Sequence, residues 1–264
     1  MAVDRALSFG ANASSYERYR PGYPDALYAR VAAYAGEPIR TALEIGAGTG
    51  KATRLFAGQG IRVTATEPDP EMLAELRRAV PEHVRPVQAA FEDLEPGETY
   101  GLVYAAASLH WTRPEGRWPL VASLLEPRGV FASFGGPVQP ADPAVAEAVQ
   151  KARAPFLATD DVPSPDGTPP DEQMQWPGTE LLRSELFEDV RQVVVERRLS
   201  LSAPDYLGHL STISAYLQLP PPERRRAFES IAKVLPETVE IDADIWLHLA
   251  RRSDAGSASP PASA

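Results

Sequence analysis

The chain has 264 residues, of which 44% are hydrophobic and 23% are charged. This is an ordinary globular composition, which excludes collagen, coiled coil and wholesale disorder. Acidic residues outnumber basic ones by 36 to 26, and the net charge of -10 argues against a nucleic-acid partner. The lack of Cys excludes disulfides, zinc ribbons and thiol nucleophiles. With no secretory signal and no membrane-spanning run in view, we expect a cytoplasmic protein with no membrane partner.

Short apolar runs alternate with helical patterns from residue 41 onward. The predicted strands are 41–45, 62–67, 84–90, 102–108 and 129–134. Strands that alternate with helices pair in parallel through right-handed crossovers. Sheets of this kind bind ligands beyond the carboxyl ends of their strands, where the strand order reverses.

Helix-start signals separate these strands. Asp69-Pro70 and Asp142-Pro143 each combine an N-cap residue with Pro at the first helical position. Thr112 to Glu115 has the spacing of a capping box. The predicted helices are 49–57, one opened by Asp69, one from Thr112 to Leu125, and one from Asp142 to Ala154.

The last third of the chain predicts two more strands, 190–201 and 239–250, with helices at 203–218 and 222–235 between them. The two strands form a hairpin that completes the sheet, and the helices cap its strand ends. The predicted fold is therefore α/β: a doubly wound, mostly parallel seven-stranded sheet with a small helical cap.

Two segments have a biased composition. Residues 155–178 contain six prolines and five acidic residues without Lys or Arg, which predicts a surface insertion. Its apolar side chains leave open that it acts as a lid. Residues 252–264 are rich in Ser, Ala and Pro and predict a disordered tail.

The loop after the first strand reads Glu44-Ile45-Gly46-Ala47-Gly48-Thr49-Gly50. Glycines at alternate positions let the backbone approach a ligand closely, and the next helix offers free N–H groups at its start. A dinucleotide fingerprint requires Gly where the chain has Lys51. A nucleotide-binding P-loop requires Ser or Thr where it has Ala52.

This loop resembles motif I of the class I S-adenosylmethionine-dependent methyltransferases, in which an acidic residue precedes G-x-G-x-G. Glu67 ends the second strand, where that family places an acid on the ribose hydroxyls. Pro68 and Met72 follow, at positions that flank the adenosine. The resemblance implies the doubly wound methyltransferase fold and S-adenosylmethionine as cofactor.

Three further segments resemble the same family. Ala90-Phe91-Glu92 stands where the family often has Asp, an apolar residue and Glu, so Phe91 is implied as a wall of the adenine site. Leu109-His110-Trp111 resembles the L-H-W of the trans-aconitate methyltransferase-like branch. Residues 16–24 match the Y-x-x-x-R-P-x-Y-P signature of that branch, whose N-terminal segment folds over the cofactor.

These arguments together give a candidate site without a metal. The expected cofactor-binding residues are Tyr16, Arg20, Glu44, Gly46, Ala47, Gly48, Glu67, Pro68, Met72, Ala90, Phe91, Glu92 and Ser108. The expected substrate-binding residues are Tyr23, His110, Trp111, Tyr206 and His209. His110, as a general base or a positioning group, and Tyr16 are the catalytic candidates. Arg20 is expected to hold the carboxylate of the cofactor or of an acidic substrate.

We expect five parts along the chain. They are a helical lid at 1–36, the cofactor-binding core at 37–154, the insertion at 155–178, C-terminal strands and cap helices at 179–251, and the tail at 252–264.

The expected function is methyl transfer to an O, N or C nucleophile of a small organic molecule by a monomer or homodimer. Two alternatives stay open beside it. One is a carboxylate O-methyltransferase of the trans-aconitate type. The other is a non-catalytic S-adenosylmethionine-binding protein, which the departures from the family pattern at Ala90 and Gly101 suggest.

Overall fold

The computed structural model describes residues 12–160 and 163–254, and the structural statements below concern these residues. The first eleven residues of the expected lid and residues 255–264 of the expected tail lie outside them.

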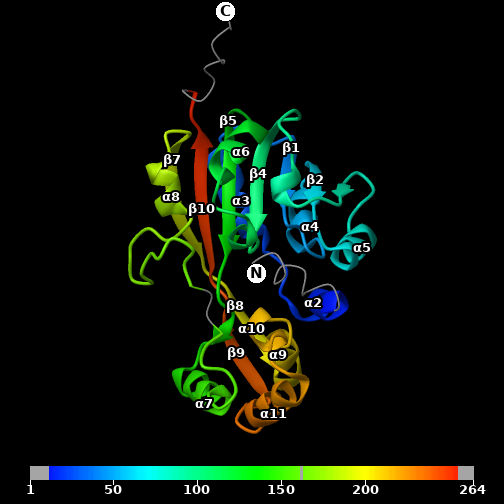
Figure 1. Ribbon diagram of the computed structural model, residues 1–264, viewed down its shortest axis with the longest axis vertical. Coiled ribbons are helices and arrows are strands. Elements are labelled where there is room, and N and C mark those ends of the chain that lie inside the picture. The colour runs from blue at the N-terminus through cyan, green and yellow to red at the C-terminus, as the bar shows by residue number, and fades with distance from the viewer. Residues whose placement is uncertain (1–11, 161–162, 255–264) are drawn as a thin grey trace, which may run out of the picture.

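A seven-stranded sheet forms the larger lobe, called the core below (Figure 1). In spatial order its strands are β3 (Arg85–Val87), β2 (Arg62–Thr66), β1 (Thr41–Ile45), β4 (Tyr100–Ala106), β5 (Leu125–Gly135), β10 (Ile245–Arg252) and β7 (Phe187–Val195). β1 to β5 pair in parallel, whereas β10 is antiparallel to both β5 and β7. The predicted fold class is confirmed, and the strand order reverses between β1 and β4.

Helices cover both faces of this sheet. They are α3 (Asp25–Ala35), α4 (Lys51–Ala57), α5 (Pro70–Ala79), α6 (Arg117–Leu124) and α8 (Gly178–Arg183). Ala42 of β1 packs in one buried cluster with α3, α4 and α5, whereas its neighbour Leu43 packs in another with α6 and α8. Successive residues of a strand point to opposite faces, so one short strand contributes to both clusters.

Two of the three predicted helix starts are confirmed. Asp69 and Asp142 are N-caps whose carboxylates accept backbone N–H hydrogen bonds from the first turns of α5 and α7 (Pro143–Arg153). The capping box predicted at Thr112 is wrong, because α6 begins only at Arg117, after Gly116 in the left-handed conformation. The Thr112 hydroxyl instead accepts a hydrogen bond from Arg117 Nε at 2.8 Å.

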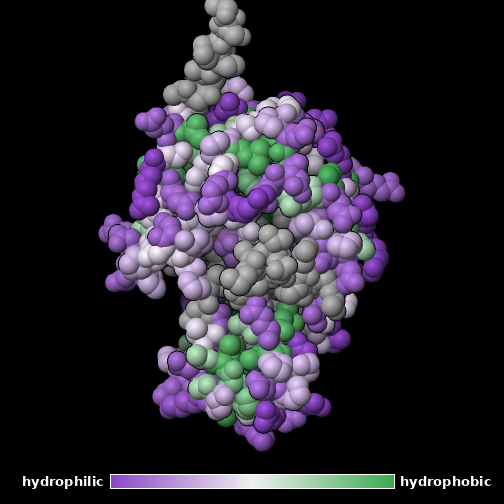
Figure 2. Space-filling view, in the orientation of Figure 1, coloured by the Kyte–Doolittle hydropathy of each residue, from purple (hydrophilic) through white to green (hydrophobic). Residues whose placement is uncertain are grey.

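A smaller lobe, called the cap below, combines a second sheet with further helices (Figure 1). Its strands in spatial order are β6 (Gln139–Pro140), β9 (Thr238–Asp242) and β8 (Arg198–Ser202). Its helices are α7, α9 (Ala203–Leu210), α10 (Ser214–Leu217) and α11 (Pro221–Ala232). Figure 2 shows hydrophilic residues over most of this face of the molecule and apolar residues gathered on part of the cap.

The two late strands were predicted as single strands, and this is wrong. The run 190–201 divides into β7 and β8, and the run 239–250 divides into β9 and β10, so each run supplies one strand to each sheet. The predicted helix 203–218 likewise divides into α9 and α10. An unbroken apolar pattern does not show where a chain leaves one sheet for another, which is why the sequence missed the second sheet.

The N-terminal helix α2 (Ala13–Tyr19) lies between the two lobes (Figure 1). Its Tyr19 ring packs on Gly208 of α9, where an added Cβ would lie 2.4 Å from a ring carbon. None of the helices in the described ranges is both long and apolar enough to cross a membrane.

Phe56 tests the packing of the core beneath α4. Its ring is fully buried, with centroids 4.4 Å from that of Tyr104 and 6.2 Å from that of Phe134. We expect Phe56→Ala to lower the free energy of unfolding by about 3–5 kcal/mol, measured by urea denaturation, because it leaves a cavity. Leu182→Ala, at a side chain that is 59% exposed, is the control and should change it by less than about 0.5 kcal/mol. Equal losses in the two variants would contradict this packing.

Candidate cofactor and acceptor site

The glycine loop, residues 46–50, turns sharply between β1 and α4. Gly46, Gly48 and Gly50 have φ angles of 64°, 57° and 86°, in the left-handed region that favours glycine. A Cβ on Gly46 would lie 2.8 Å from Ser108 Cβ, whereas a Cβ on Gly48 would meet no atom within 4 Å. The loop therefore packs against the protein at Gly46 and faces open space at Gly48.

Glu67 joins this loop to the end of β2. One carboxylate oxygen accepts from the Gly48 N–H at 2.8 Å, and the other accepts from the Asp69 N–H at 2.9 Å. Burial raises the pKa of the Glu67 carboxyl, while these two hydrogen bonds act in the opposite direction. Each carboxylate oxygen has a second lone pair, so the group retains acceptor capacity for hydroxyl donors.

Glu44 lies at the carboxyl end of β1 and is buried. Its Oε2 accepts from the Thr53 hydroxyl at 2.5 Å and the Tyr104 hydroxyl at 2.9 Å. Its Oε1 is buried and has no hydrogen-bond partner among the described residues. Burial raises the pKa of Glu44 to about 8, with the two hydroxyl groups lowering it. A buried carboxylate oxygen without a partner is costly, and it suits a ligand that brings a donor or a positive charge.

A cleft between the lobes opens beside the glycine loop. Its core wall is formed by Glu44, residues 46–49, Lys51, Ala52, Ala106, Ala107, Gly135 and Gly136. Its other wall is formed by Tyr16, Arg20, Pro21, Tyr23, Val138, Arg197 and residues 243–245. The structure therefore brings together, around one cleft, the predicted residues Tyr16, Arg20, Tyr23, Glu44, Gly46, Ala47 and Gly48.

Helix α2 is fastened to the glycine-loop helix by Glu17. Lys51 Nζ donates to the Glu17 carbonyl oxygen at 2.6 Å and lies 3.5 Å from its carboxylate. Arg54 Nη2 donates to the same carboxylate at 2.8 Å. Lys51, which a P-loop would direct at a phosphate, is thus engaged in holding α2.

Arg20 connects α2 to the cap. Its Nε and Nη2 donate to the hydroxyl and carbonyl oxygens of Thr212 at 2.8 and 3.1 Å. The guanidinium carbon lies 5.4 Å from the centroid of the Tyr16 ring. Tyr23 packs edge-on against Phe134 with centroids 5.0 Å apart. Burial, together with Tyr16 and Glu44, raises the pKa of Tyr23, so its hydroxyl stays protonated.

The residues predicted around the adenosine lie beyond β2 and β3, outside the residues that line the cleft. Met72 is buried in the first turn of α5, and Phe91 is buried in the short 3-10 helix η2 (Phe91–Asp93), which Ala90 precedes. The Glu92 carboxylate accepts from the Arg113 N–H at 2.6 Å. The carbonyl oxygen of Pro68 accepts from Gln88 at 3.4 Å.

The residues predicted after β4 lie near the loop but do not line the cleft. The Ser108 hydroxyl donates to the carbonyl oxygen of Ile45, so Ser108 supports the start of the glycine loop. His110 and Trp111 lie in the 3-10 helix η3 (Leu109–Trp111), with ring centroids 4.6 Å apart. Their roles toward an acceptor stay predictions.

Tyr206 and His209 belong to the buried part of α9. Tyr206 packs in the core of the cap, where burial raises its pKa. His209 is 1% exposed, and burial followed by the charge of Arg20 lowers its pKa to about 3. Neither side chain is among the residues that line the cleft, and the acceptor contact predicted for both stays a prediction.

Arg197 and Asp244 line the cleft and were not among the predicted site residues. They lie where the chain passes from β7 to β8 and from β9 to β10. The Arg197 N–H donates to Asp244 Oδ1 at 2.7 Å and ties the two crossings together. The sequence holds no local signal for this pair, because it depends on the division of two runs that the sequence predicted as continuous.

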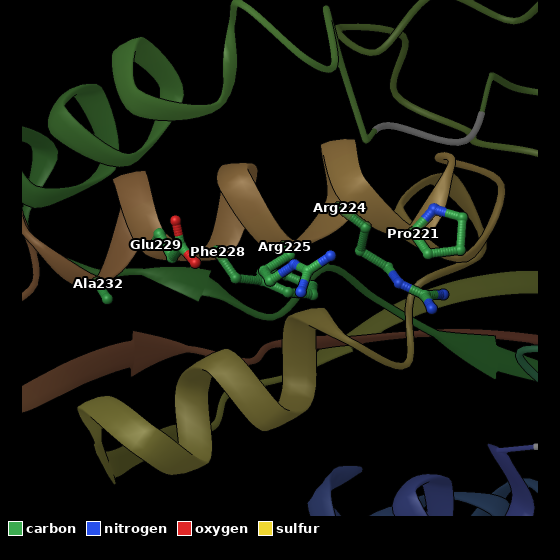
Figure 3. Close-up of a pocket in the computed structure, with 6 residues that line it drawn as sticks. All are labelled: Pro221, Arg224, Arg225, Phe228, Glu229 and Ala232. Carbon is green, nitrogen blue, oxygen red and sulfur yellow. The ribbon is translucent and has the colours of Figure 1, made fainter.

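A separate hollow lies along α11, away from the glycine loop (Figure 3). It is lined by Pro221, Arg224, Arg225, Phe228, Glu229 and Ala232. All of these come from one helix, and none of the predicted site residues is among them.

Comparison with known proteins identifies the part of the chain that builds the core wall. A profile of the methyltransferase domain family matches residues 42–129. This third of the chain is similar to a methyltransferase domain. This domain supplies β1, the glycine loop, Glu67 and β4, so the family resemblance drawn from those residues is confirmed.

Relatives of the methyltransferase domain include a protein of Mycobacterium tuberculosis named an uncharacterised methyltransferase. It is 39% identical over 127 residues, 48% of this chain and 51% of the relative. The trans-aconitate 2-methyltransferase of Escherichia coli O1:K1 is 35% identical over 119 residues, 44% of this chain and 45% of that enzyme. The chain thus spans about half the length of the curated relatives it matches.

Solved structures extend the likeness to the whole fold. A protein from Anaeromyxobacter dehalogenans described as a proposed type II methyltransferase is 26% identical, with a TM-score of 0.63. The match covers 88% of this chain and 98% of that chain. The methyltransferase domain and the doubly wound sheet together establish a Rossmann-like methyltransferase fold.

The methyltransferase family implies S-adenosylmethionine as cofactor, and residues at the glycine loop suit it, with Gly48 and Glu44 lining the cleft and Glu67 beside it. The open space at Gly48 admits a ligand close to the backbone. The unpartnered Oε1 of Glu44 suits the positive charge of the cofactor, and Glu67 suits its ribose hydroxyls. These three residues would hold the cofactor.

Gly48 provides a test of where the ligand lies. In Gly48→Ala the new Cβ projects into open space at a positive φ, so we expect a loss of stability of only about 1 kcal/mol. Binding of S-adenosylhomocysteine, measured by calorimetry, should fall at least about tenfold, because the methyl group occupies ligand space. Thr159→Ala, in the segment after α7, is the control and should bind normally. Normal binding by Gly48→Ala would place the ligand elsewhere.

Glu44 gives a pH-dependent prediction. Its folded-state pKa of about 8 exceeds the ordinary value of 4.5, so the folded protein binds more protons than the unfolded chain between these values. Its contribution to stability therefore falls as pH rises through that window, by up to about 1.4 kcal/mol per pH unit. We expect Glu44→Gln to reduce this fall, measured by urea denaturation from pH 6.5 to 8.

That pH range also separates Glu44 from the buried histidines. Burial lowers the pKa of His209 to about 3 and of His248 to about 4, so their contributions change only below their ordinary value of 6.5. About one pH unit above that value they are neutral in both states, and any remaining histidine contribution is the same in the wild type and in Glu44→Gln. Identical pH slopes for the wild type and Glu44→Gln would contradict the raised pKa of Glu44.

Proposed function

We propose that the protein is an S-adenosylmethionine-dependent methyltransferase that acts on an O, N or C nucleophile of a small organic molecule. The observation that carries this proposal is that Gly48, whose N–H donates to the Glu67 carboxylate, lines the same cleft as the buried acid Glu44. The loop leaves room for a ligand, and both acids suit a cationic, hydroxyl-rich one. When bound, the cofactor supplies a methyl group activated by a positively charged sulfur.

The residues of the chain supply position rather than covalent chemistry in this proposal. Glu67 holds the ribose, Glu44 faces the charged part of the cofactor, and Arg20 with Tyr16 closes the cleft from α2. Holding two reactants in attack geometry is worth about 7–11 kcal/mol of barrier, which makes such positioning a sufficient source of catalysis. His110 is the candidate that accepts a proton from a hydroxyl or amine acceptor.

A carboxylate O-methyltransferase is the second candidate. It is favoured by the likeness to trans-aconitate 2-methyltransferase over 44% of this chain. A carboxylate acceptor is already ionised at neutral pH and needs no general base. Methyl ester formation that survives in His110→Ala would support this candidate, and its loss would support an acceptor that requires deprotonation.

Glu67→Ala tests the proposed function. S-adenosylmethionine at about 100 times its dissociation constant should stabilise the wild-type protein by about 2.7 kcal/mol, measured as a rise in melting temperature. We expect Glu67→Ala to lose most of this rise, because the ribose hydroxyls lose their acceptor. Glu82→Ala, an exposed acid before β3, is the matched control and should keep the full rise.

Two results would contradict parts of this proposal. A full rise in Glu67→Ala would show that the ribose is not held there. Cofactor binding by the wild type without methyl transfer to any acceptor in a broad metabolite extract would identify a cofactor-binding protein that is not an enzyme.

A further inference from the structure

The second wall of the cleft is built from chain that lies outside the methyltransferase domain. Arg197 and Asp244 stand at the two crossings between the core and the cap, and Ile245 follows in β10. A Cβ on Gly136, just beyond β5, would lie 2.0 Å from the Asp244 carbonyl oxygen, so this wall is in direct contact with the end of β5. The wall therefore belongs to the β5–β10 end of the sheet.

The cofactor residues belong to a different stretch of the same edge. Glu44 is the penultimate residue of β1 and Glu67 directly follows β2, whereas β10 is the third strand from β1 in the order β1-β4-β5-β10. Neighbouring strands lie about 4.8 Å apart, which separates the ends of β1 and β10 by roughly 14 Å. A group bound beside Arg197 therefore lies away from Glu44 and Glu67 along the same edge of the sheet.

Arg197 brings an unbalanced positive charge to this wall. Other guanidinium groups have acidic partners, such as Arg54 with Glu17 at 2.8 Å and Arg198 with Asp244 at 2.7 Å. Within residues 12–160 and 163–254, the guanidinium of Arg197 has no carboxylate within 4.0 Å. Its Nη1 donates to the Gly22 carbonyl oxygen at 2.6 Å, a neutral group that fixes its direction.

The local acid does not neutralise Arg197. Asp244 accepts from the Arg197 backbone N–H and from the Arg198 side chain, and these contacts hold the pKa of Asp244 below its ordinary value. Partial burial lowers the pKa of the Arg197 guanidinium, but an arginine side chain keeps its charge in a folded protein. A half-buried arginine with free N–H donors and no acid is suited to an anion.

Tyr23 adds a neutral donor beside this charge. The charges of Arg20 and Arg197 both act on its phenol and lower its pKa, against the larger effect of burial. All three side chains also line the cleft. Arg20 already donates to Thr212 through two nitrogens, which leaves Arg197 as the less committed cation.

We propose that Arg197, with the Tyr23 hydroxyl beside it, binds a carboxylate group of the methyl acceptor and so determines acceptor specificity. This inference rests on the proposed function, since it assigns the acceptor half of that site. It identifies the acceptor by class, as a small molecule with an anionic carboxylate. It also gives the connections between the core and the cap, where Arg197 and Asp244 lie, a role in recognition. The same carboxylate chemistry occurs in the cofactor, so the test must separate the two sources.

The experiment measures binding of two carboxylate–amide pairs and of trans-aconitate. Succinate with succinamide, and benzoate with benzamide, are titrated by calorimetry in the presence of saturating S-adenosylhomocysteine. We expect at least one carboxylate to bind the wild type while its amide does not. Arg197→Gln should weaken that carboxylate about thirtyfold, the size expected for a lost charge-assisted hydrogen bond. Arg197→Lys keeps the positive charge but loses the paired N–H donors of the guanidinium, and it should weaken carboxylate binding less.

Arg62→Gln is the matched control. It removes the same charge at an exposed residue where β2 begins, at the opposite edge of the sheet, and should leave carboxylate binding within about twofold. Affinity for S-adenosylhomocysteine should stay within about threefold in all three variants, which also shows that they are folded.

Every other result contradicts the inference. The titration with S-adenosylhomocysteine shows whether the proposed function or only the acceptor site is contradicted. A wild type that does not bind S-adenosylhomocysteine contradicts the proposed function itself. A wild type that binds it but binds no carboxylate contradicts only the acceptor site. Loss of S-adenosylhomocysteine affinity in Arg197→Gln with unchanged carboxylate binding would assign Arg197 to the carboxylate of the cofactor.

Discussion

A buried acid at the end of the first strand is the constraint on which the site depends. Glu44 receives two hydroxyl hydrogen bonds on one oxygen and none on the other, in surroundings that contain no cation paired with it among the described residues. Apolar residues of the same shape would stabilise the core better. The cost of retaining the acid is explained if a ligand brings the missing partner, because binding then relieves part of the desolvation penalty.

The glycine loop brings exposed backbone close to this acid, and together they form the candidate site. Its left-handed residues bend the backbone away from β1 and back over Glu67, whose carboxylate accepts the Gly48 N–H. Any side chain at Gly46 would collide with Ser108, and any at Gly50 with Leu76, so the bend is fixed by packing on both sides. Only Gly48 faces empty space. The loop therefore exposes its backbone at Gly48, next to Glu67 and in the cleft that Glu44 lines.

The core of this arrangement was predictable because it is encoded locally. The alternation of apolar runs and helix caps gave the parallel strands, and the spacing of three glycines after Glu44 gave the loop. The crossings at residues 196–197 and 243–244 were not predictable, because each lies inside a run whose apolar pattern continues from one sheet into the other. The second sheet and Arg197 were missed for that reason. The burial of His209 was not predictable either, because a helical pattern does not distinguish a face that packs under α2 from one that faces a cleft.

The contacts of α2 explain how one short helix can join both lobes. Glu17 binds Lys51 and Arg54 at the start of α4, while Arg20 binds Thr212 after α9. The ion pairs on the core side are partly exposed, and such pairs contribute little individually. Arg20 likewise uses only two hydrogen bonds to the cap. Helix α2 is therefore joined to both lobes by specific contacts, because the Tyr19 ring packs on Gly208 of α9 in addition to these polar interactions. Its position beside the glycine loop is set by side chains of both lobes, so the cleft depends on how α2, the core and the cap pack together.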